Sequence, residues 1–201
     1  MSNLTENDIE AKIEEHIKAV MDLLELDITP SNEGTPHRVA KMWAKEVFAN
    51  RNNRNIEELN AKMKTFPDEY NNDLVIVRDI PFSSTCEHHW LPFSGKVTVA
   101  YVPNGKVIGL SKIPRVVKYF SKQPTLQEKL GRDIGNYLFD ILEPFVIYVF
   151  ITSTHSCVKC RGAESDCSTS TQYSMYNNKL GLTKSELETL NNNLLQRVGA
   201  I

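Results

Sequence analysis

Residues 145–154 read FVIYVFITST, an almost continuously apolar run that is rich in β-branched and aromatic residues. A run of this length and composition is typical of a strand that lies inside a sheet and is covered on both faces. Alternating apolar residues and turn signals elsewhere in the chain predict further strands. These strands fall at residues 74–80, 95–103, 107–110 and 168–176.

Apolar residues at helical spacing predict helices before the first strand and again between strands. The predicted helices cover residues 7–26, 35–49, 56–64 and 111–122, and a long helix opens where Thr125 and Glu128 have the form of a capping box. This order of elements predicts an α+β fold with an antiparallel sheet. We expect residues 1–65 to form an N-terminal helical region and residues 66–201 to form the domain that carries the sheet.

The composition of the 201 residues is that of an ordinary globular chain, with 41% hydrophobic and 24% charged residues. A net charge of −2 excludes a general polyanion-binding surface, so we expect no nucleic-acid partner and only local anion sites. No apolar run approaches the roughly 20 residues that span a bilayer, so we expect no membrane partner. The polar, acidic N-terminus does not have the pattern of a secretory signal or transit peptide, which predicts a cytoplasmic location.

Cysteine and histidine gather in two short segments, CEHH at residues 86–89 and HSCVKC at residues 155–160. A cytosolic chain of this size does not need disulfides, so metal binding or catalysis is the better interpretation. Cys86, His89 and Cys157 offer a zinc ion two sulfurs and one nitrogen and leave a fourth position open, as in catalytic zinc sites.

Two further histidines, His88 and His155, then lie beside the ion without binding it, where proton-transfer groups belong. The same spacing also suits a closed structural zinc site with Cys160 as the fourth ligand, and a third alternative is no metal at all. The extra histidines and the basic residues nearby favour the open site, because a closed site has no use for them.

Several basic residues form candidate anion sites. Ser111, Lys112 and Arg115 lie at the start of a predicted helix, which is a favourable place for an anion. Arg38 and Lys41 share one helix face, and Arg161 follows Cys157 by four residues. The alternative for each set is a solvated surface.

Gln127 and Glu128 open the long helix and have two interpretations. Glu128 can complete the capping box that begins at Thr125. Its carboxylate can instead accept hydrogen bonds from the N–H groups of a guanine base. The residues alone do not decide between these two uses.

Four segments in this order resemble the type I GTP cyclohydrolase family: CEHHWLPFSGKVTVAYVP (86–103), VIGLSKIPRVV (107–117), PTLQEKL (124–130) and HSCVKCRG (155–162). TPHRVAKMW and VRDIPFSSTCEHH extend the resemblance toward the N-terminus, so that it covers about residues 35–171. The combination is specific to the family, and it implies that the metal is a catalytic zinc, one ion in each subunit.

The resemblance implies hydrolysis of GTP at C8 of the guanine, release of formate and rearrangement to 7,8-dihydroneopterin triphosphate, the first step of tetrahydrofolate and pterin biosynthesis. No redox cofactor is implied, because the rearrangement is internal to the sugar. The implied zinc ligands are Cys86, His89 and Cys157. The resemblance also implies that His155 handles protons at the purine nitrogens and that His88 acts as an acid or base near the ribose.

The same resemblance assigns the remaining residues. Ser111 assists the carbohydrate rearrangement, and Glu128 with Gln127 anchors the guanine edge. Lys112, Arg115 and Arg161 hold the triphosphate, with Arg38 and Lys41 contributed by a neighbouring subunit. The implied fold is the tunnelling fold, an antiparallel sheet with two backing helices, so that residues 66–201 become a tunnelling-fold catalytic domain. Its subunits form pentameric barrels that stack as a homodecamer with active sites between subunits.

The chain departs from the family near its C-terminus, where STSTQYSMYNNKLG replaces the usual Gly-x-Phe pattern. Two other classes of protein stay open from the sequence. One is a related tunnelling-fold enzyme that acts on another purine or pterin, which would not need the triphosphate-binding cations. The other is a non-catalytic, zinc-stabilised binding or assembly protein, which requires Cys160 as a ligand.

Overall fold

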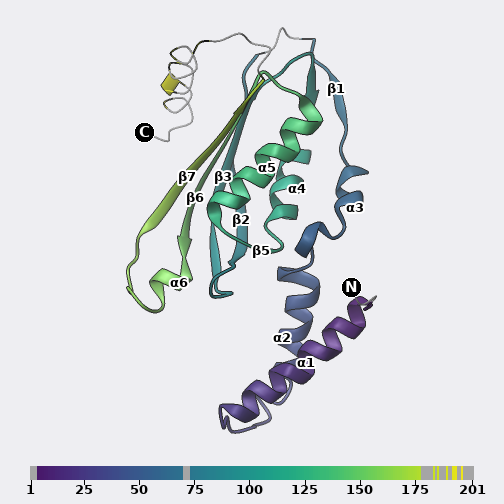
Figure 1. Cartoon of the computed structure of the whole chain (residues 1–201), viewed down its shortest axis with the longest axis vertical. Coiled ribbons are helices and arrows are strands. Elements are labelled where there is room, and N and C mark those ends of the chain that lie inside the picture. Colours follow the sequence, from purple (N-terminus) through teal and green to yellow (C-terminus); the bar gives the residue numbers. More distant parts are fainter. Residues whose placement is uncertain are drawn as a thin grey trace.

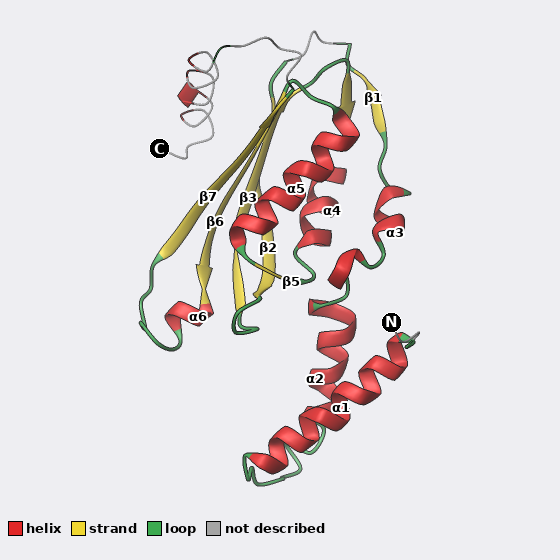
Figure 2. Ribbon diagram, viewed as in Figure 1, coloured by secondary structure: helices red, strands yellow, loops and turns green. Residues whose placement is uncertain are grey.

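The structure is a computed structural model that describes residues 4–69 and 73–177, together with the isolated residues 183, 185, 189, 192, 193 and 196. A sheet lies against two helices, and an arm of N-terminal helices extends from the lower end of this body (Figure 1, Figure 2). The arrangement confirms the predicted α+β class with a largely antiparallel sheet.

The main sheet has the strand order β5-β2-β3-β6-β7. Neighbouring strands are antiparallel except for β5, which pairs in parallel with the end of β2. The strands are β2 (Val75–Cys86), β3 (Pro92–Val102), β5 (Pro124–Thr125), β6 (Val146–His155) and β7 (Ser168–Tyr176), while β1 (Thr65–Pro67) and β4 (Lys106–Ile108) form a separate pair. The predicted strands are confirmed, and β2 continues beyond residue 80 to Cys86.

One face of the sheet is covered by α4 (Lys112–Phe120) and α5 (Gln127–Leu142) (Figure 1). Along β6, Ile147, Val149 and Ile151 belong to the main core, which includes the buried side of both helices. The alternate residues of β6, including Tyr148 and Phe150, belong to a second buried cluster. Both faces of β6 are therefore buried, as the apolar run at 145–154 predicts.

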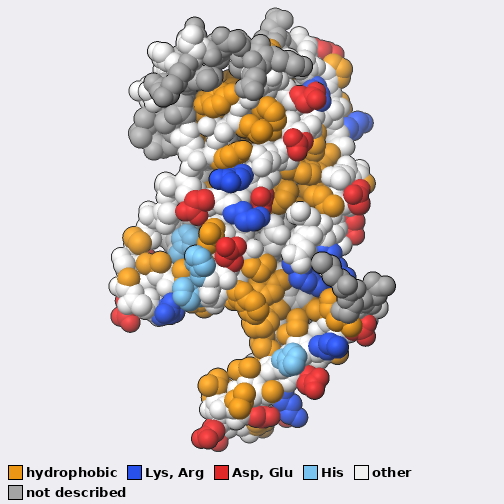
Figure 3. Space-filling view, viewed as in Figure 1, with side chains coloured by type: hydrophobic (Ala, Val, Ile, Leu, Met, Phe, Trp, Pro, Cys, Tyr) orange, Lys and Arg blue, Asp and Glu red, His pale blue; other side chains and the backbone are white. Residues whose placement is uncertain are grey.

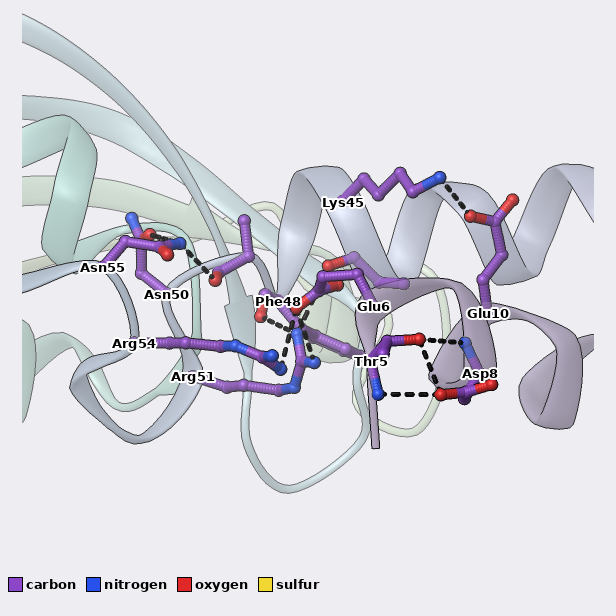
Figure 4. Close-up of polar contacts among 12 residues, drawn as sticks. Thr5, Glu6, Asp8, Glu10, Lys45, Phe48, Asn50, Arg51, Arg54 and Asn55 are labelled. Atoms are coloured by element: carbon purple, nitrogen blue, oxygen red, sulfur yellow. Dashed lines mark hydrogen bonds and ion pairs between the residues drawn. The ribbon is translucent and has the colours of Figure 1, made fainter. Parts of the chain in front are cut away.

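The arm consists of α1 (Glu6–Leu23), α2 (Thr35–Met42), a π-helical turn (Trp43–Val47) and a short 3-10 turn (Arg51–Asn53), whereas α3 (Ile56–Asn60) lies beside the body, where Leu59 joins the main core (Figure 1). Glu6 at the start of α1 forms ion pairs with Arg51 at 3.2 Å and with Arg54 at 2.7 Å, and Glu10 pairs with Lys45 (Figure 4). These pairs join α1 to the segment that leads into the body. The division of the chain at residue 65 stays a prediction.

The expected capping box at Thr125 is wrong. The α5 helix begins at Gln127 with Leu126 as its N-cap and without a side-chain cap. Thr125 instead lies in β5 opposite Cys86, and its hydroxyl donates to the backbone oxygen of Leu126 at 3.2 Å. Thr125 pairs with the end of β2 instead of capping the helix. The Glu128 carboxylate therefore takes no part in a capping box.

The expected single helix at 35–49 is also interrupted, because the chain changes from α-helix to π-helix at Trp43. The helix expected at 56–64 is shorter and ends at Asn60. Among the described helices, none is both long enough and apolar enough to cross a membrane.

Gly95 offers a test of the β3–β6 pairing. It lies opposite Ser153, and a Cβ atom at this position would lie 1.9 Å from the backbone oxygen of Thr152. We expect Gly95→Ala to lower the free energy of unfolding by about 1–3 kcal/mol, because the strand backbones must separate. Urea denaturation measures the change.

Gly131→Ala in α5 is the matched control, since a Cβ there meets only side-chain atoms, of Ile151 at 3.5 Å and of Tyr173 at 3.7 Å. It should leave stability unchanged or raise it by up to about 1 kcal/mol. Equal stability of Gly95→Ala and the wild type would contradict the close approach of the two strands.

Candidate functional site

The site lies at the lower end of the sheet, where β3 begins between the ends of β2 and β6. Ser84 in β2, Phe93 in β3 and His155 in β6 lie in one row across these strands. The spacing of strands places β2 and β6 about 10 Å apart. Their continuations can meet only beyond the start of β3, and this is where Cys86 and Cys157 lie.

Two short segments bring the sulfur atoms together. The turn formed by residues 87–91 connects β2 to β3, and α6 (Ser156–Lys159) follows β6. The ligand atoms of Cys86, His89 and Cys157 all lie within 4.8 Å of one another. Donor atoms around one tetrahedral zinc ion are separated by about 3.3–3.8 Å, so small side-chain shifts would close the set on an ion.

The chemistry of these donors fits zinc. Burial, and then the neighbouring Cys86 thiol, raise the pKa of the Cys157 thiol, whereas Arg161 acts in the opposite direction. Two thiols that are held together in this way gain from a cation, which binds them as thiolates. A pair of sulfurs with one imidazole nitrogen is a common donor set for zinc and leaves one position open.

Cys160 lies outside this group. It is exposed, and the described residues contain a three-donor group that does not include it. The alternative of a closed structural site needs Cys160 as the fourth ligand, so the described arrangement does not favour it. All four cysteines are free thiols.

The side chain of Gln127 is buried and its amide orientation is set by the backbone. Its Nε2 donates to the backbone oxygens of Ile151 at 3.0 Å and Thr169 at 3.2 Å, which can only accept. The Oε1 atom therefore faces Ser153 and His155, at 2.6 Å from Ser153 Oγ and 2.9 Å from His155 Nε2.

This network assigns a tautomer to His155. Because Gln127 Oε1 is an acceptor, His155 Nε2 carries the hydrogen, and Nδ1 of the neutral ring is left as the acceptor. Burial lowers the pKa of His155, while the charge of Glu128 opposes that shift. The ring also stacks on Phe93 with centroids 4.7 Å apart. The result is a neutral imidazole held in one orientation beside the candidate metal ligands.

A cavity of about 440 Å³ opens next to these groups, which is within the usual size range of small-molecule sites. Its lining includes Cys86, His88, Gln127, Glu128 and His155. Glu128 is exposed in the first turn of α5, so its carboxylate is available to a ligand. Histidine side chains gather visibly at this end of the molecule (Figure 3).

The remaining predicted residues lie elsewhere in the chain. Ser111 and Lys112 are at the start of α4, whose other end leads to β5 beside Cys86. The 9-residue helix is about 14 Å long, so both residues lie far from the metal ligands. Arg115 lines a different cavity of about 270 Å³ with Lys118 and Lys122.

Arg38 and Lys41 lie on α2 in the arm, where Arg38 donates to the backbone oxygen of Ser31 at 3.1 Å. Arg161 follows α6 and is exposed close to Cys157. One chain thus brings together the metal ligands, both histidines, Gln127, Glu128 and Arg161. It keeps the other five predicted residues apart from that set.

Sequence reasoning missed the residues that hold His155. Ser153 lies two positions before His155, and strand periodicity alone places both side chains on one face. Phe93 and Thr169 join the site through strand pairing and so have no comparable local signal.

The fold and the site together define an α+β protein in which a candidate Cys–His–Cys metal site adjoins a cavity of the size usual for small-molecule ligands. The model of the family GTP cyclohydrolase I matches residues 13–192. The chain therefore belongs to the GTP cyclohydrolase I family, which confirms the family prediction made from its motifs.

Curated relatives agree with this family. The GTP cyclohydrolase 1 of Vibrio campbellii is 40% identical over 163 residues, covering 80% of this chain and 73% of the relative. That of Blochmanniella pennsylvanica is 42% identical over 161 residues, covering 80% and 72%. That of Photobacterium profundum is 43% identical over 155 residues, covering 75% and 69%. An archaeosine synthase QueF-like structure aligns with a TM-score of 0.43 and 19% identity, over 50% of this chain and 91% of that one.

Single substitutions distinguish the open metal site from the closed one. We expect Cys157→Ala to weaken zinc binding by about 100-fold or more, because one of few strong donors is lost. Cys160→Ser should bind zinc as the wild type does. Zinc titration against a chromophoric chelator measures both affinities. Loss of zinc from Cys160→Ser would show that the site is closed by a fourth cysteine.

Proposed function

We propose that the chain is a zinc-dependent GTP cyclohydrolase I that opens the imidazole ring of guanine, releases formate and forms 7,8-dihydroneopterin triphosphate. The observation that carries the proposal is the convergence of Cys86, His89 and Cys157 beside the cavity that contains Glu128. Membership of the family supports it.

Cys86, His89 and Cys157 would hold the zinc ion, one in each subunit. When bound, zinc supplies activation of a water molecule at neutral pH. No redox cofactor takes part in the proposal. The donor set and the free thiols support this assignment.

His155 acts as the proton acceptor and donor at the purine nitrogens. Its Nδ1 is the open position of the neutral ring, because Gln127 engages Nε2 at 2.9 Å. Gln127 thereby works as a positioning residue rather than as the guanine contact that the resemblance implies, because its amide already bonds to protein groups. His88, which also lines the cavity, serves as the acid or base near the ribose.

Glu128 receives the guanine edge. An ionised carboxylate accepts from the ring N–H and the 2-amino group at once, which no neutral side chain does as well. Its exposure within the cavity and its release from helix capping support this role.

We propose that the triphosphate is held by Lys112, Arg115 and Arg161 together with Arg38 and Lys41, and that Ser111 assists the later rearrangement of the sugar. The cations other than Arg161 lie away from the cavity of their own chain. Their separation supports active sites that are built between subunits.

The proposed assembly is a decamer of two stacked pentameric barrels. In the described sheet, β7 is an edge strand of 9 residues and β5 covers only a short part of β2, so both edges can pair with other subunits. The arm exposes Leu23 by 82%, Leu24 by 64% and Ile28 by 58%, and apolar surface of this kind marks interaction sites.

Within this proposal, residues 1–65 form the helical region and residues 66–201 the tunnelling-fold catalytic domain. The proposal includes a cytoplasmic location, since free cysteines persist where thiols are kept reduced. The product would enter tetrahydrofolate and pterin biosynthesis.

Incubation of the zinc-loaded oligomer with GTP is the direct test. We expect one formate per GTP and the appearance of a pterin chromophore. His155→Ala should lower kcat by about 10²–10⁴-fold while zinc content is unchanged, because proton transfer is lost. Gln127→Leu should lower kcat by a smaller factor at similar KM, since it releases the ring of His155.

Formate assay, absorbance and metal analysis provide the three measurements. The proposal fails if the loaded oligomer, with its mass established by light scattering, yields neither formate nor pterin. Full turnover by zinc-loaded His155→Ala would remove that residue from the mechanism.

Glu128→Gln tests the guanine contact. We expect kcat/KM for GTP to fall by about 10–100-fold, because a hydrogen-bonded charge is lost. The loss should be smaller for inosine triphosphate, which lacks the 2-amino group. Lys129→Gln is the control, because Lys129 is exposed and pairs with Asp133 on the surface of the same helix. Equal losses for both nucleotides would argue against a contact between Glu128 and the amino group.

A further inference from the structure

The turn that carries His89 is short and tightly closed. The backbone N–H of Trp90 donates to the oxygen of Cys86 at 2.8 Å, and the N–H of Cys86 donates to the oxygen of Leu91 at 2.9 Å. Two of the three metal ligands, Cys86 and His89, therefore lie within one turn. Its conformation decides whether the imidazole of His89 can reach the two sulfurs.

Trp90 closes this turn in an unfavourable backbone conformation. Its φ angle is 53°, in the left-handed region that residues with a Cβ atom rarely adopt. A conformation of this kind persists where the surrounding structure determines it. The backbone of His89 is bonded directly to Trp90, so whatever holds Trp90 also holds the ligand.

The indole of Trp90 packs on two aromatic rings of the N-terminal arm. Its ring centroid lies 5.2 Å from Trp43 at an interplanar angle of 85°, and 5.4 Å from Phe48 at 64°. Trp43 and Phe48 are themselves 5.9 Å apart. Edge-to-face contacts at these distances are attractive. We call Trp43, Phe48 and Trp90 the aromatic triad.

The π-helical turn is what brings two members of the aromatic triad together. The N–H of Phe48 donates to the oxygen of Trp43 at 3.1 Å, a bond between residues five apart. In an α-helix, residues five apart are turned from one another by about 140°. The wider π turn places them on one side, and such turns are frequent at functional sites.

Contacts within the arm fix the π-helical turn. Arg51 donates to the oxygens of Ala44 at 3.2 Å and Phe48 at 2.9 Å, and it pairs with Glu6 of α1 (Figure 4). Hydrophobic side chains gather where the arm meets the body (Figure 3). A continuous set of contacts therefore runs from α1 through the aromatic triad to the turn of His89.

We propose that the aromatic triad is a positioning element for the metal site, which fixes the turn of residues 86–91 so that His89 stays within reach of Cys86 and Cys157. Zinc affinity then depends on the placement of the N-terminal arm, although no residue of the arm binds the ion. Trp43 and Trp90 are positioning residues. The inference rests on the proposed function, because it concerns the same metal.

Metal affinity of full-length variants tests the proposal. We expect Trp43→Ala and Trp90→Ala to weaken zinc binding by about 10–100-fold, the range found when groups that orient metal ligands are lost. Trp43→Phe, which keeps an aromatic ring, should restore most of the affinity. Phe66→Ala is the matched control, since Phe66 in β1 is 45% exposed and Trp90 is 52% exposed. It should bind zinc as the wild type does.

Substitution of cobalt for zinc gives a second readout. Cobalt bound to thiolates absorbs visible and near-ultraviolet light in bands that report the coordination geometry, so a displaced His89 should alter the spectrum of Trp43→Ala but not of Phe66→Ala. Chelator competition and thermal unfolding are measured on the same samples. If Trp43→Ala does not fold, Trp43→Leu replaces it, because leucine fills the space without an aromatic edge.

Wild-type zinc affinity and an unchanged cobalt spectrum in the folded variants would overturn the proposal, and a lower melting temperature alone would then mark the triad as structural. Failure of the wild type to bind either metal would instead overturn the proposed function itself, and this inference with it. The two failures are therefore distinguishable.

Discussion

The pairing register of three strands is the constraint on which the site depends. Ser84, Phe93 and His155 share a row, so the segments that follow β2 and β6 leave the sheet at the same level, on either side of β3. A slip of one residue in β6 would turn His155 to the other face and carry Cys157 away from Cys86. The close approach of Gly95 to the β6 backbone belongs to the same pairing. The strand register therefore also decides whether the three candidate metal ligands converge.

Two consecutive residues at the start of α5, Gln127 and Glu128, line the cavity in different ways. Gln127 is buried. Its amide nitrogen donates to two backbone oxygens, and its amide oxygen accepts from Ser153 and His155. Glu128 is exposed, and its side chain lines the cavity. This division is possible because the helix begins after Thr125, which is engaged in strand pairing with Cys86.

Local patterns predicted the elements well and their junctions less well. The apolar run at 145–154 and the alternation at 168–176 correspond to β6 and β7, because burial of strand faces leaves a periodic signal. The capping-box form at Thr125 was misleading, since a long-range pair replaces the local bond. Spacing grouped Cys86, His89 and Cys157 but left Cys160 open as a fourth ligand, and the convergence of the three follows from the strand register. The role of Gln127 needed the backbone oxygens of two strands, and those have no sequence signature.

The π-helical turn at Trp43–Val47 has a consequence for how the arm can vary. Each residue of a helix turns the chain by about 100°, so a π turn is in effect an α-helix with one residue inserted. Deleting any one residue of that turn would rotate everything before it by more than a quarter revolution, with Arg38 and Lys41 pointing in a new direction. The length of this five-residue segment therefore determines the direction in which the arm points. Natural variants should change the side chains of this segment more readily than the number of its residues.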